Sequence, residues 1–382
     1  MICDIIDNIA NRKGEIDMPT HIKEIKIESY RGLKGMSISD LGDINILLGN
    51  NNCGKTSVLE VLSTLDAPLD FYTWYDNVFY RCLIREPGSF YSRIPQLFCF
   101  EEKKQHIRYS ALTEKKEEIN VSIGLKKSNI FLTAQDVKCI DELAYYQLAT
   151  HDEDSPDFQI DTEMLQCTIS VSGGEREDKV KYDIYPFSRR INRKRKYTSL
   201  QIVPTVICRF LENNNINIIN KLLEVNRNKT MLIKLLQKFD RRITGISTVD
   251  NIIRIESTEY EQTVPLSCYG DGIRQAVNIF CHMIRAEGGL LLIDEFDSAI
   301  HVQNMSETIK LIFQACKELN IQLIVTTHNQ EAITALLEGA GENLDNMRLI
   351  RMRKLSDKII CKTIEGTVAL ENITELGMEY RI

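Results

Sequence analysis

The stretch that most constrains this fold is Gly49–Thr56, which has the pattern G-x-x-x-x-G-K-T. An apolar run from Ile44 to Leu48 precedes it and a second apolar segment starts at Ser57, so the sequence predicts a strand, a turn and a helix. Glycines in such a turn let backbone N–H groups approach phosphate oxygens, and the helix N-terminus favours the same anion. The stretch therefore predicts a phosphate-binding loop within an α/β fold.

Each residue type in this loop has an expected role. Lys55 would hold the β- and γ-phosphates, and the Thr56 hydroxyl would bind a magnesium ion shared with the nucleotide and a carboxylate. The expected nucleotide-binding set from this loop is Asn50, Asn51, Asn52, Gly54, Lys55, Thr56 and Ser57. The alternative is an ordinary glycine-rich turn, and partner motifs elsewhere in the chain weigh against it.

Composition limits the class of protein. With 382 residues, 43% apolar and 26% charged, the chain can form one large domain with insertions or two to three ordinary domains. A net charge of −7 argues against binding nucleic acid over the whole surface. The eleven cysteines are irregularly spaced without a C-x-x-C pair, which predicts free thiols in a reducing compartment. We expect a cytoplasmic protein without a signal peptide or membrane contact.

Regular patterns begin after a polar leader at residues 1–20. Strands are expected over residues 21–27 and, after a turn at residues 30–33, up to Leu48. The aromatic segment 71–80 predicts packing in the core or a lid rather than a surface that stacks bases.

The middle of the chain has three kinds of pattern. Residues 106–111, 119–125 and 165–171 are β-like and predict a β-rich insertion, whereas residues 205–241 have helical spacing. Between them lie the six cations Arg189, Arg190, Arg193, Lys194, Arg195 and Lys196. Such a run indicates either a solvated surface or a contact with nucleic-acid phosphates or an acidic partner.

Two later segments supply carboxylates and a histidine. Four apolar residues precede Asp294 and Glu295, a pattern typical of a buried parallel strand whose carboxyl end faces ligands. Asp294 would organise magnesium, and Glu295 would act as general base or orient the attacking water. A second apolar strand would bring His328 to the same sheet edge, where it could donate a hydrogen bond to the γ-phosphate. An amphipathic helix over residues 305–319 would cover the sheet between them.

A second anion-binding surface is expected at residues 265–274. The Ser267 hydroxyl, Gly270 and Gly272 precede a helix N-terminus there, and this combination suits phosphate. One chain would then have two phosphate-binding loops but only one set of magnesium and base residues. The simplest explanation is that the second loop serves the nucleotide of a neighbouring subunit.

Four motifs, in their order along the chain, resemble those of the ABC-type ATPase heads of the RecF/SMC/OLD group. They are G-N-N-N-C-G-K-T, L-S-C-Y-G-D-G-I-R, G-G-L-L-L-I-D-E-F-D-S-A-I-H and T-T-H. Over residues 21–65 and 250–382 the chain is most similar to stand-alone OLD-like AAA-type ATPases, several of which act in bacterial anti-phage defence. The resemblance implies a P-loop NTPase head with a mixed or parallel sheet flanked by helices. It also implies that ATP and Mg²⁺ bind between two subunits, with Ser267 and Gly270 of one closing on nucleotide held by Lys55 of the other.

The resemblance implies further roles. Asp297 would belong to the loop that links the two sites, His301 matches a histidine of relatives, and Gln96 is our candidate for the glutamine that couples the lobes. The stretch Ser-Cys-Tyr-Gly-Asp-Gly departs from the Leu-Ser-Gly-Gly-Gln signature of transporters, so we expect slow ATP hydrolysis. The acidic cluster of a Toprim nuclease does not follow, so any nuclease would be a separate protein.

These features divide the chain into five expected segments. They are a leader at 1–20, an N-terminal ATPase lobe at 21–68, a β-rich insertion with the cationic run at 69–200, a helical segment at 201–245, and a C-terminal ATPase lobe at 246–382.

Three functions follow from these expectations. The first is an ATP-hydrolysing regulatory subunit of an anti-phage defence system, a homodimer or higher homo-oligomer that controls a separately encoded nuclease or toxin. The second is a RecF/SMC-like DNA-binding ATPase of repair or recombination, with the cationic run on nucleic acid. The third is a scaffold that binds ATP to assemble and hydrolyses it negligibly. The expected catalytic residues are Lys55, Glu295 and His328, and the expected metal ligands are Thr56 and Asp294.

Overall fold

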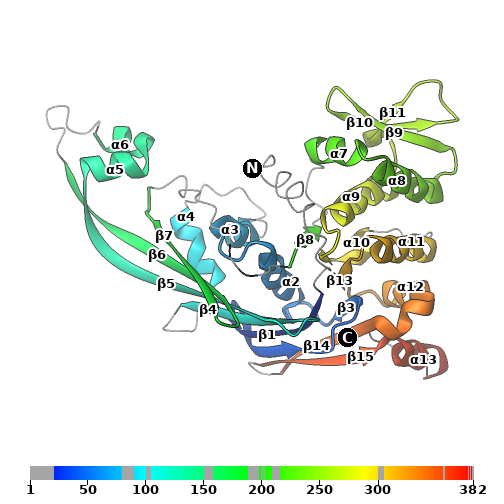
Figure 1. Cartoon of the computed structure of the whole chain (residues 1–382), viewed down its shortest axis with the longest axis horizontal. Coiled ribbons are helices and arrows are strands. Elements are labelled where there is room, and N and C mark those ends of the chain that lie inside the picture. The colour runs from blue at the N-terminus through cyan, green and yellow to red at the C-terminus, as the bar shows by residue number, and fades with distance from the viewer. Residues whose placement is uncertain are drawn as a thin grey trace.

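Two six-stranded sheets organise the molecule, and a small three-stranded sheet lies at one end (Figure 1). The computed structural model describes residues 21–79, 90–99, 105–149, 158–187, 198, 200, 203–208, 216–299, 305–355, 358–376, 378 and 380. The leader, the cationic run and His301 lie outside these described residues.

The mixed sheet carries the phosphate loop at the carboxyl end of its strand β3. Its order is β15(Lys358–Glu365), β14(Met347–Leu355), β3(Ile44–Leu48), β13(Gln322–Thr326), β12(Leu290–Ile293) and β8(Thr205–Cys208). The strands from β14 to β8 are parallel, and β15 pairs antiparallel with β14. Every residue of β3, β12 and β13 is buried, and alternate residues of β3 and β12 enter two different hydrophobic clusters. Burial on both faces explains why these strands are continuous apolar runs.

The second large sheet is antiparallel throughout. Its order is β2(Leu33–Ile38), β1(Ile22–Tyr30), β4(His106–Thr113), β5(Glu118–Thr133), β6(Gln159–Gly173) and β7(Arg176–Ile184). Figure 1 shows the long β5–β6 ribbon projecting from the body, with α5(Ala134–Ile140) and α6(Glu142–Ala149) at its far end. The segment predicted as an insertion is thus joined to the N-terminal strands by one continuous sheet.

The small sheet has the order β11(Val264–Pro265), β10(Ile252–Ser257) and β9(Ile243–Val249). The remaining α-helices among the described residues are α2(Lys55–Ser63), α3(Phe71–Phe79), α4(Phe90–Arg93), α7(Ile216–Leu223), α8(Asn226–Phe239), α9(Asp271–Arg285), α10(Phe296–Ala299), α11(Met305–Glu318), α12(Gln330–Ala340) and α13(Gly366–Leu376). The 3-10 helices are η2(Thr64–Asp66), η3(Ile94–Leu97), η4(Leu266–Cys268) and η6(Gly341–Asn346). None of these described helices is long and apolar enough to cross a membrane.

Several predictions from the sequence are confirmed. The expected α/β class, the β-like stretches within β4, β5 and β6, and the helix over residues 305–319 are all present. The aromatic segment forms α3, and Trp74 is buried there with its indole N–H donating to the carbonyl of Pro68 at 2.9 Å. All nine cysteines in the described part of the chain are free.

The prediction of helix from Thr205 is wrong at its start. Residues 205–208 form strand β8, which pairs in parallel with Leu290–Ile293 of β12. A four-residue apolar run cannot be assigned to a helix or a buried strand by periodicity alone, and the neighbouring strand decides the outcome here. Helix begins at Ile216.

The prediction of one strand from the first turn to Leu48 is also wrong. The chain forms β2, turns, and enters the other sheet as β3. Asp40 has a φ of 58°, and a Cβ on Gly42 would collide with the carbonyl oxygen of Asn346. This turn therefore separates the two sheets at a point where the apolar pattern alone shows only a short polar break.

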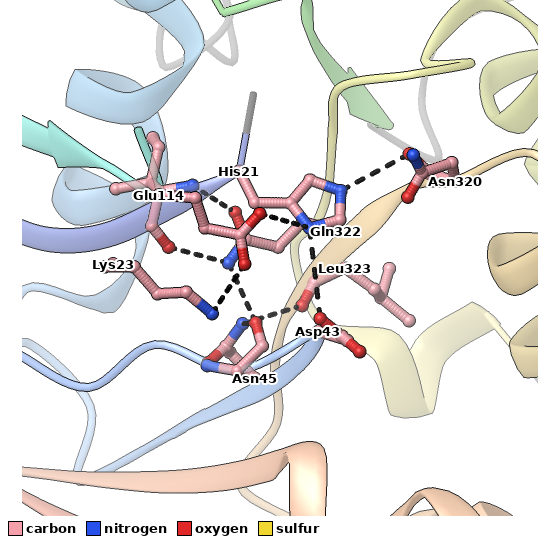
Figure 2. Close-up of polar contacts among 10 residues, drawn as sticks. His21, Lys23, Asp43, Asn45, Glu114, Asn320, Gln322 and Leu323 are labelled. Carbon is pink, nitrogen blue, oxygen red and sulfur yellow. Dashed lines mark hydrogen bonds and ion pairs between the residues drawn. The ribbon is translucent and has the colours of Figure 1, made fainter. Parts of the chain in front are cut away.

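A polar network joins the two large sheets at the amino ends of β1, β3 and β13 (Figure 2). The buried Gln322 amide accepts from Ile22 N at 2.8 Å and donates to Ile22 O and Gly42 O, each at 2.8 Å. Asn45 Nδ2 donates to Leu323 O at 3.3 Å. His21 Nδ1 lies 3.9 Å from an Asp43 carboxylate oxygen. The sheets are therefore fixed together at the edge opposite the carboxyl ends of the parallel strands.

Candidate nucleotide-binding site

The phosphate loop connects β3 to α2 through two glycines in left-handed or related backbone conformations. Gly49 has a φ of 153° and Gly54 a φ of 96°. A Cβ at Gly49 would lie 2.5 Å from the Met352 carbonyl oxygen, and one at Gly54 would lie 2.5 Å from Cδ2 of Leu33. Only glycine fits these positions without displacing neighbours, because the β14 backbone and β2 pack directly against the loop.

Lys55 begins α2 and folds back over the loop. Its Nζ donates to Gly49 O at 2.6 Å and to Asn50 O at 3.2 Å. Gly54 is the N-cap residue of α2, and no side chain caps the helix. The first-turn N–H groups and the lysine ammonium therefore offer donors of the kind that binds phosphate at a helix N-terminus.

A cavity of about 550 Å³ lies over this loop. That volume is within the usual range for small-molecule sites. Its lining residues are Gly32, Leu33, Asn51, Asn52, Cys53, Gly54, Lys55, Thr56, Ser57, Asp294, Glu295, Thr326, Thr327, His328, Lys354 and Ile359. Asn50 lines a second cavity of about 420 Å³, which also includes Asn51, Thr327, His328 and Tyr380.

The turn after β12 presents the two predicted carboxylates. Glu295 has a φ of 52°, which is uncommon for a residue with a side chain. Its N–H donates to Thr326 Oγ1 at 2.8 Å, and the Thr326 hydroxyl donates to Asp294 Oδ1 at 2.6 Å. One buried threonine at the end of β13 thus holds both the strained backbone of Glu295 and the orientation of Asp294.

The end of β13 also positions the histidine. The Thr327 hydroxyl donates to Asp297 Oδ1 at 2.7 Å and accepts from Asn329 N at 3.2 Å. His328 is 59% exposed, and its Nδ1 lies 3.8 Å from Asp297 Oδ2. His328 therefore lines the cavity with a carboxylate close to its imidazole ring.

The oxygen donors in the cavity fit magnesium. The Thr56 hydroxyl and the Asp294 carboxylate line the same space as Lys55, and both are hard oxygen ligands. Within the described residues no group of three or more His, Cys, Asp or Glu side chains could hold a metal ion by itself. This donor set suits an ion that completes its coordination with water and nucleotide oxygens.

The second predicted anion-binding loop lies elsewhere on the surface. Ser267 is in η4, Gly270 is the N-cap residue of α9, and Gly272 lies in the first turn of that helix. Ser267 and Gly270 are exposed, and none of the three lines the cavity over the phosphate loop. The structure therefore does not bring this loop to the site of its own chain.

The cavity also contains residues that the sequence did not suggest. Thr326 and Thr327 immediately precede His328, so their position in T-T-H was an available signal. Lys354, Ile359 and Leu33 come from hairpins whose contact with the loop no local pattern indicates. Gln96 is exposed in η3 and is absent from the cavity lining, so its coupling role stays a prediction.

The parallel sheet, the glycine-rich turn and the lysine at the start of α2 define a P-loop NTPase fold. Residues 21–126 match the family of the AAA ATPase domain, and residues 190–334 match the family described as "AAA domain, putative AbiEii toxin, Type IV TA system". The chain thus carries AAA-type ATPase domains.

Curated proteins that are similar to this chain include the following two. An ATP/GTP phosphatase of Helicobacter pylori is 23% identical over 335 residues, which cover 82% of this chain and 87% of that protein. An uncharacterized protein of Methanocaldococcus jannaschii is 30% identical over 116 residues, which cover 29% of this chain and 98% of that protein.

Solved structures of SMC heads are also similar. The SMC head domain from Thermotoga maritima has a TM-score of 0.44 at 11% identity and covers 90% of this chain and 99% of that chain. The Smc head domain from Pyrococcus furiosus with an extended coiled coil, bound to the C-terminal domain of ScpA, has a TM-score of 0.48 at 9% identity, covering 94% and 100%. The sheet order and the phosphate loop of this chain define its P-loop NTPase fold.

Proposed function

We propose that this protein binds ATP with Mg²⁺ in the cavity over the phosphate loop and hydrolyses it slowly. The observation that carries the proposal is that Lys55, Asp294, Glu295 and His328 line one cavity although they come from three separate segments of the chain. The shared cavity supports a common role for these residues, because an ordinary glycine-rich turn would not be expected to lie beside an acidic turn and a histidine. The similarity to an ATP/GTP phosphatase supports the same conclusion.

The chemistry can be assigned to individual groups. Lys55 would exchange the carbonyl oxygens of Gly49 and Asn50 for phosphate oxygens of the nucleotide. Glu295 would accept a proton from water as that water attacks the γ-phosphate, and His328 would donate a hydrogen bond to the phosphate oxygens. Magnesium, held by Thr56 and Asp294, would neutralise charge on the phosphates.

The site would be completed by a second copy of the chain. Ser267, Gly270 and the N-terminus of α9 are exposed and suited to an anion, yet they do not face the nucleotide cavity of their own chain. A head-to-tail dimer would place this loop of one subunit on the γ-phosphate bound by the other. Nucleotide binding would then control assembly.

Two substitutions test the ATPase proposal. Lys55→Ala should abolish nucleotide binding, whereas Glu295→Gln should keep binding and lower phosphate release by about a hundredfold or more, because a general base contributes about that much. Glu338→Gln, on an exposed position of α12 outside the cavity, is the matched control. Equal phosphate release by wild type and Glu295→Gln would remove Glu295 from its role.

We further propose a regulatory role in an anti-phage defence system, with a separately encoded nuclease or toxin as effector. The motif order and the match to a family whose description names a toxin support this role. The test uses cells that carry the chain with its native gene neighbours. Lys55→Ala should raise the efficiency of phage plating on these cells to that on unprotected cells. Equal plating on protected and unprotected cells would exclude defence against the phages tested.

A DNA-binding repair ATPase is the second candidate, because six cations occur within residues 189–196. Binding to duplex DNA would weaken steeply with salt and with Lys or Arg to Gln substitutions in that run. Absence of DNA binding at low salt would exclude it.

A further inference from the structure

The β14–β15 hairpin extends beyond the carboxyl edge of the parallel sheet. Arg351 of β14 pairs with Leu48, the last residue of β3, whereas β14 continues to Leu355. Lys354 lies three residues past that pairing, about 10 Å further along the strand. The hairpin therefore forms a wall beside the phosphate loop, and Lys354 lines the cavity there.

Alternation along β14 places Lys354 on the face that α2 covers. Ile350 and Met352 belong to the hydrophobic cluster that contains α2 residues, and Lys354 has the same parity. Its cross-strand partner Ile359 belongs to that cluster too. Ile359 and Leu33 both lie near Gly54, so Lys354 stands at the outer end of an apolar corner of the cavity.

Within the part of the chain that the structure describes, Lys354 is a cation with no bonded neighbour. Among the described residues no hydrogen bond or ion pair engages its ammonium group, whereas Lys55 is held by two loop carbonyls. An ammonium group that lines a phosphate-binding cavity is available to an anionic ligand.

The order of strands in the sheet indicates which part of a nucleotide Lys354 would contact. The catalytic groups follow β12 and β13 on one side of β3, and Lys354 is on β14 on the other side. β12 and β14 are three strand spacings apart, about 14 Å, which is similar to the length of an extended nucleoside triphosphate. If the γ-phosphate lies at the β12–β13 end, the sugar end lies toward β14.

We propose that Lys354 binds the phosphate nearest the sugar of the nucleotide, with Leu33 and Ile359 packed against the sugar or base. This inference rests on the proposed ATP site. The triphosphate would then be held by a cation at each of its ends, Lys55 at the β- and γ-phosphates and Lys354 at the α-phosphate. Because Lys354 contacts a phosphate that does not react, it contributes equally to ground and transition states.

The test is equilibrium binding of ATP and ADP to the full chain, with steady-state phosphate release. Lys354→Met keeps the apolar stem and removes the charge, and it should weaken ATP and ADP alike by about tenfold, raising KM with little change in kcat. Lys354→Arg should restore most of the affinity. Lys358→Met is the matched control, because Lys358 is an exposed lysine on the same hairpin outside the cavity lining, and it should stay within about twofold of wild type.

The outcomes separate this inference from the ATPase proposal. Affinities of Lys354→Met within twofold of wild type for both nucleotides would overturn the assignment, as would a loss confined to ATP, which would place Lys354 at the γ-phosphate. A wild-type protein that binds neither nucleotide would overturn the ATP site itself. Thermal unfolding without nucleotide should be the same for Lys354→Met and wild type, which shows that any loss arises at the site.

Discussion

Two adjacent threonines at the end of β13 set the geometry of the acidic turn. Thr326 and Thr327 are each 1% exposed, and each hydroxyl donates to a different carboxylate, Asp294 and Asp297. A buried hydroxyl with two partners fixes the side chains that it contacts, because any other orientation would leave a polar group unpaired. These threonines therefore position groups that would themselves meet the nucleotide or its metal ion.

Thr326→Val tests this positioning role. Valine keeps the shape but loses both hydrogen bonds, so Asp294 should turn more freely, and the Mg²⁺ concentration for half-maximal phosphate release should rise about tenfold. Thr326→Ser, which retains the hydroxyl, should restore the wild-type value. A purely structural role would lower the thermal midpoint without moving the Mg²⁺ dependence, and that result would contradict the prediction.

Among the secondary-structure elements, the start of β13 fixes one sheet against the other. Gln322 is 0% exposed, and its amide makes an accepted and a donated hydrogen bond with the backbone of Ile22 in β1. The Gln322 side chain thus connects the parallel sheet to the backbone of the antiparallel sheet (Figure 2). This contact fixes the amino end of β1 against β13, and the β1–β2 turn at the other end of β1 brings Gly32 and Leu33 to the cavity over the phosphate loop.

Gln322→Leu should lower the free energy of unfolding by about 2–4 kcal/mol, because it leaves the buried N–H and C=O of Ile22 without this partner. Denaturant unfolding followed by circular dichroism measures the change. Gln314→Leu, on an exposed position of α11, is the control and should change stability by no more than about 0.5 kcal/mol. A loss equal in both variants would show that the Gln322 network contributes nothing specific.

At the scale of the whole molecule, the proposed active unit contains two chains. The exposed loop at Ser267 and the nucleotide cavity lie on one chain but do not meet there. An arrangement of this kind makes assembly depend on nucleotide, since each loop would bind the γ-phosphate held by the other subunit.

Ser267→Arg should prevent this assembly without affecting nucleotide affinity in the single chain. In the Glu295→Gln background, which keeps ATP from turnover, sedimentation with ATP and Mg²⁺ should give a dimer, and adding Ser267→Arg should leave a monomer. A dimer in both variants would exclude the loop from the interface.

Thiol labelling gives an independent measure of the same interface. Cys268 is exposed next to Ser267, whereas burial raises the pKa of Cys281 and Cys316 to about 12 and keeps those thiols protonated and unreactive at neutral pH. Peptide mass spectrometry should therefore show that ATP protects Cys268 of Glu295→Gln from maleimide. Cys139, exposed on the distant α5, should label equally with and without ATP.

Local sequence determined the elements that carry the site. An apolar run precedes the phosphate loop, the acidic pair after β12 and the histidine after β13. Buried parallel strands have continuous apolar sequences because both of their faces are covered. Their common sheet edge follows from the same rule, since parallel strands present their carboxyl ends together.

Tertiary structure alone decided which distant segments reach that edge. Residues 205–208 form a strand because they pair with the edge of β12. The chain passes from one sheet to the other near Gly42, where the Asn346 carbonyl leaves no room for a Cβ. Lys354 and Leu33 entered the cavity through hairpin contacts set by register, which the side-chain pattern of either hairpin does not encode. The alternation of side chains along a strand determines which face of the sheet a residue occupies. It does not determine which strand lies beside it, so these contacts depend on long-range pairing.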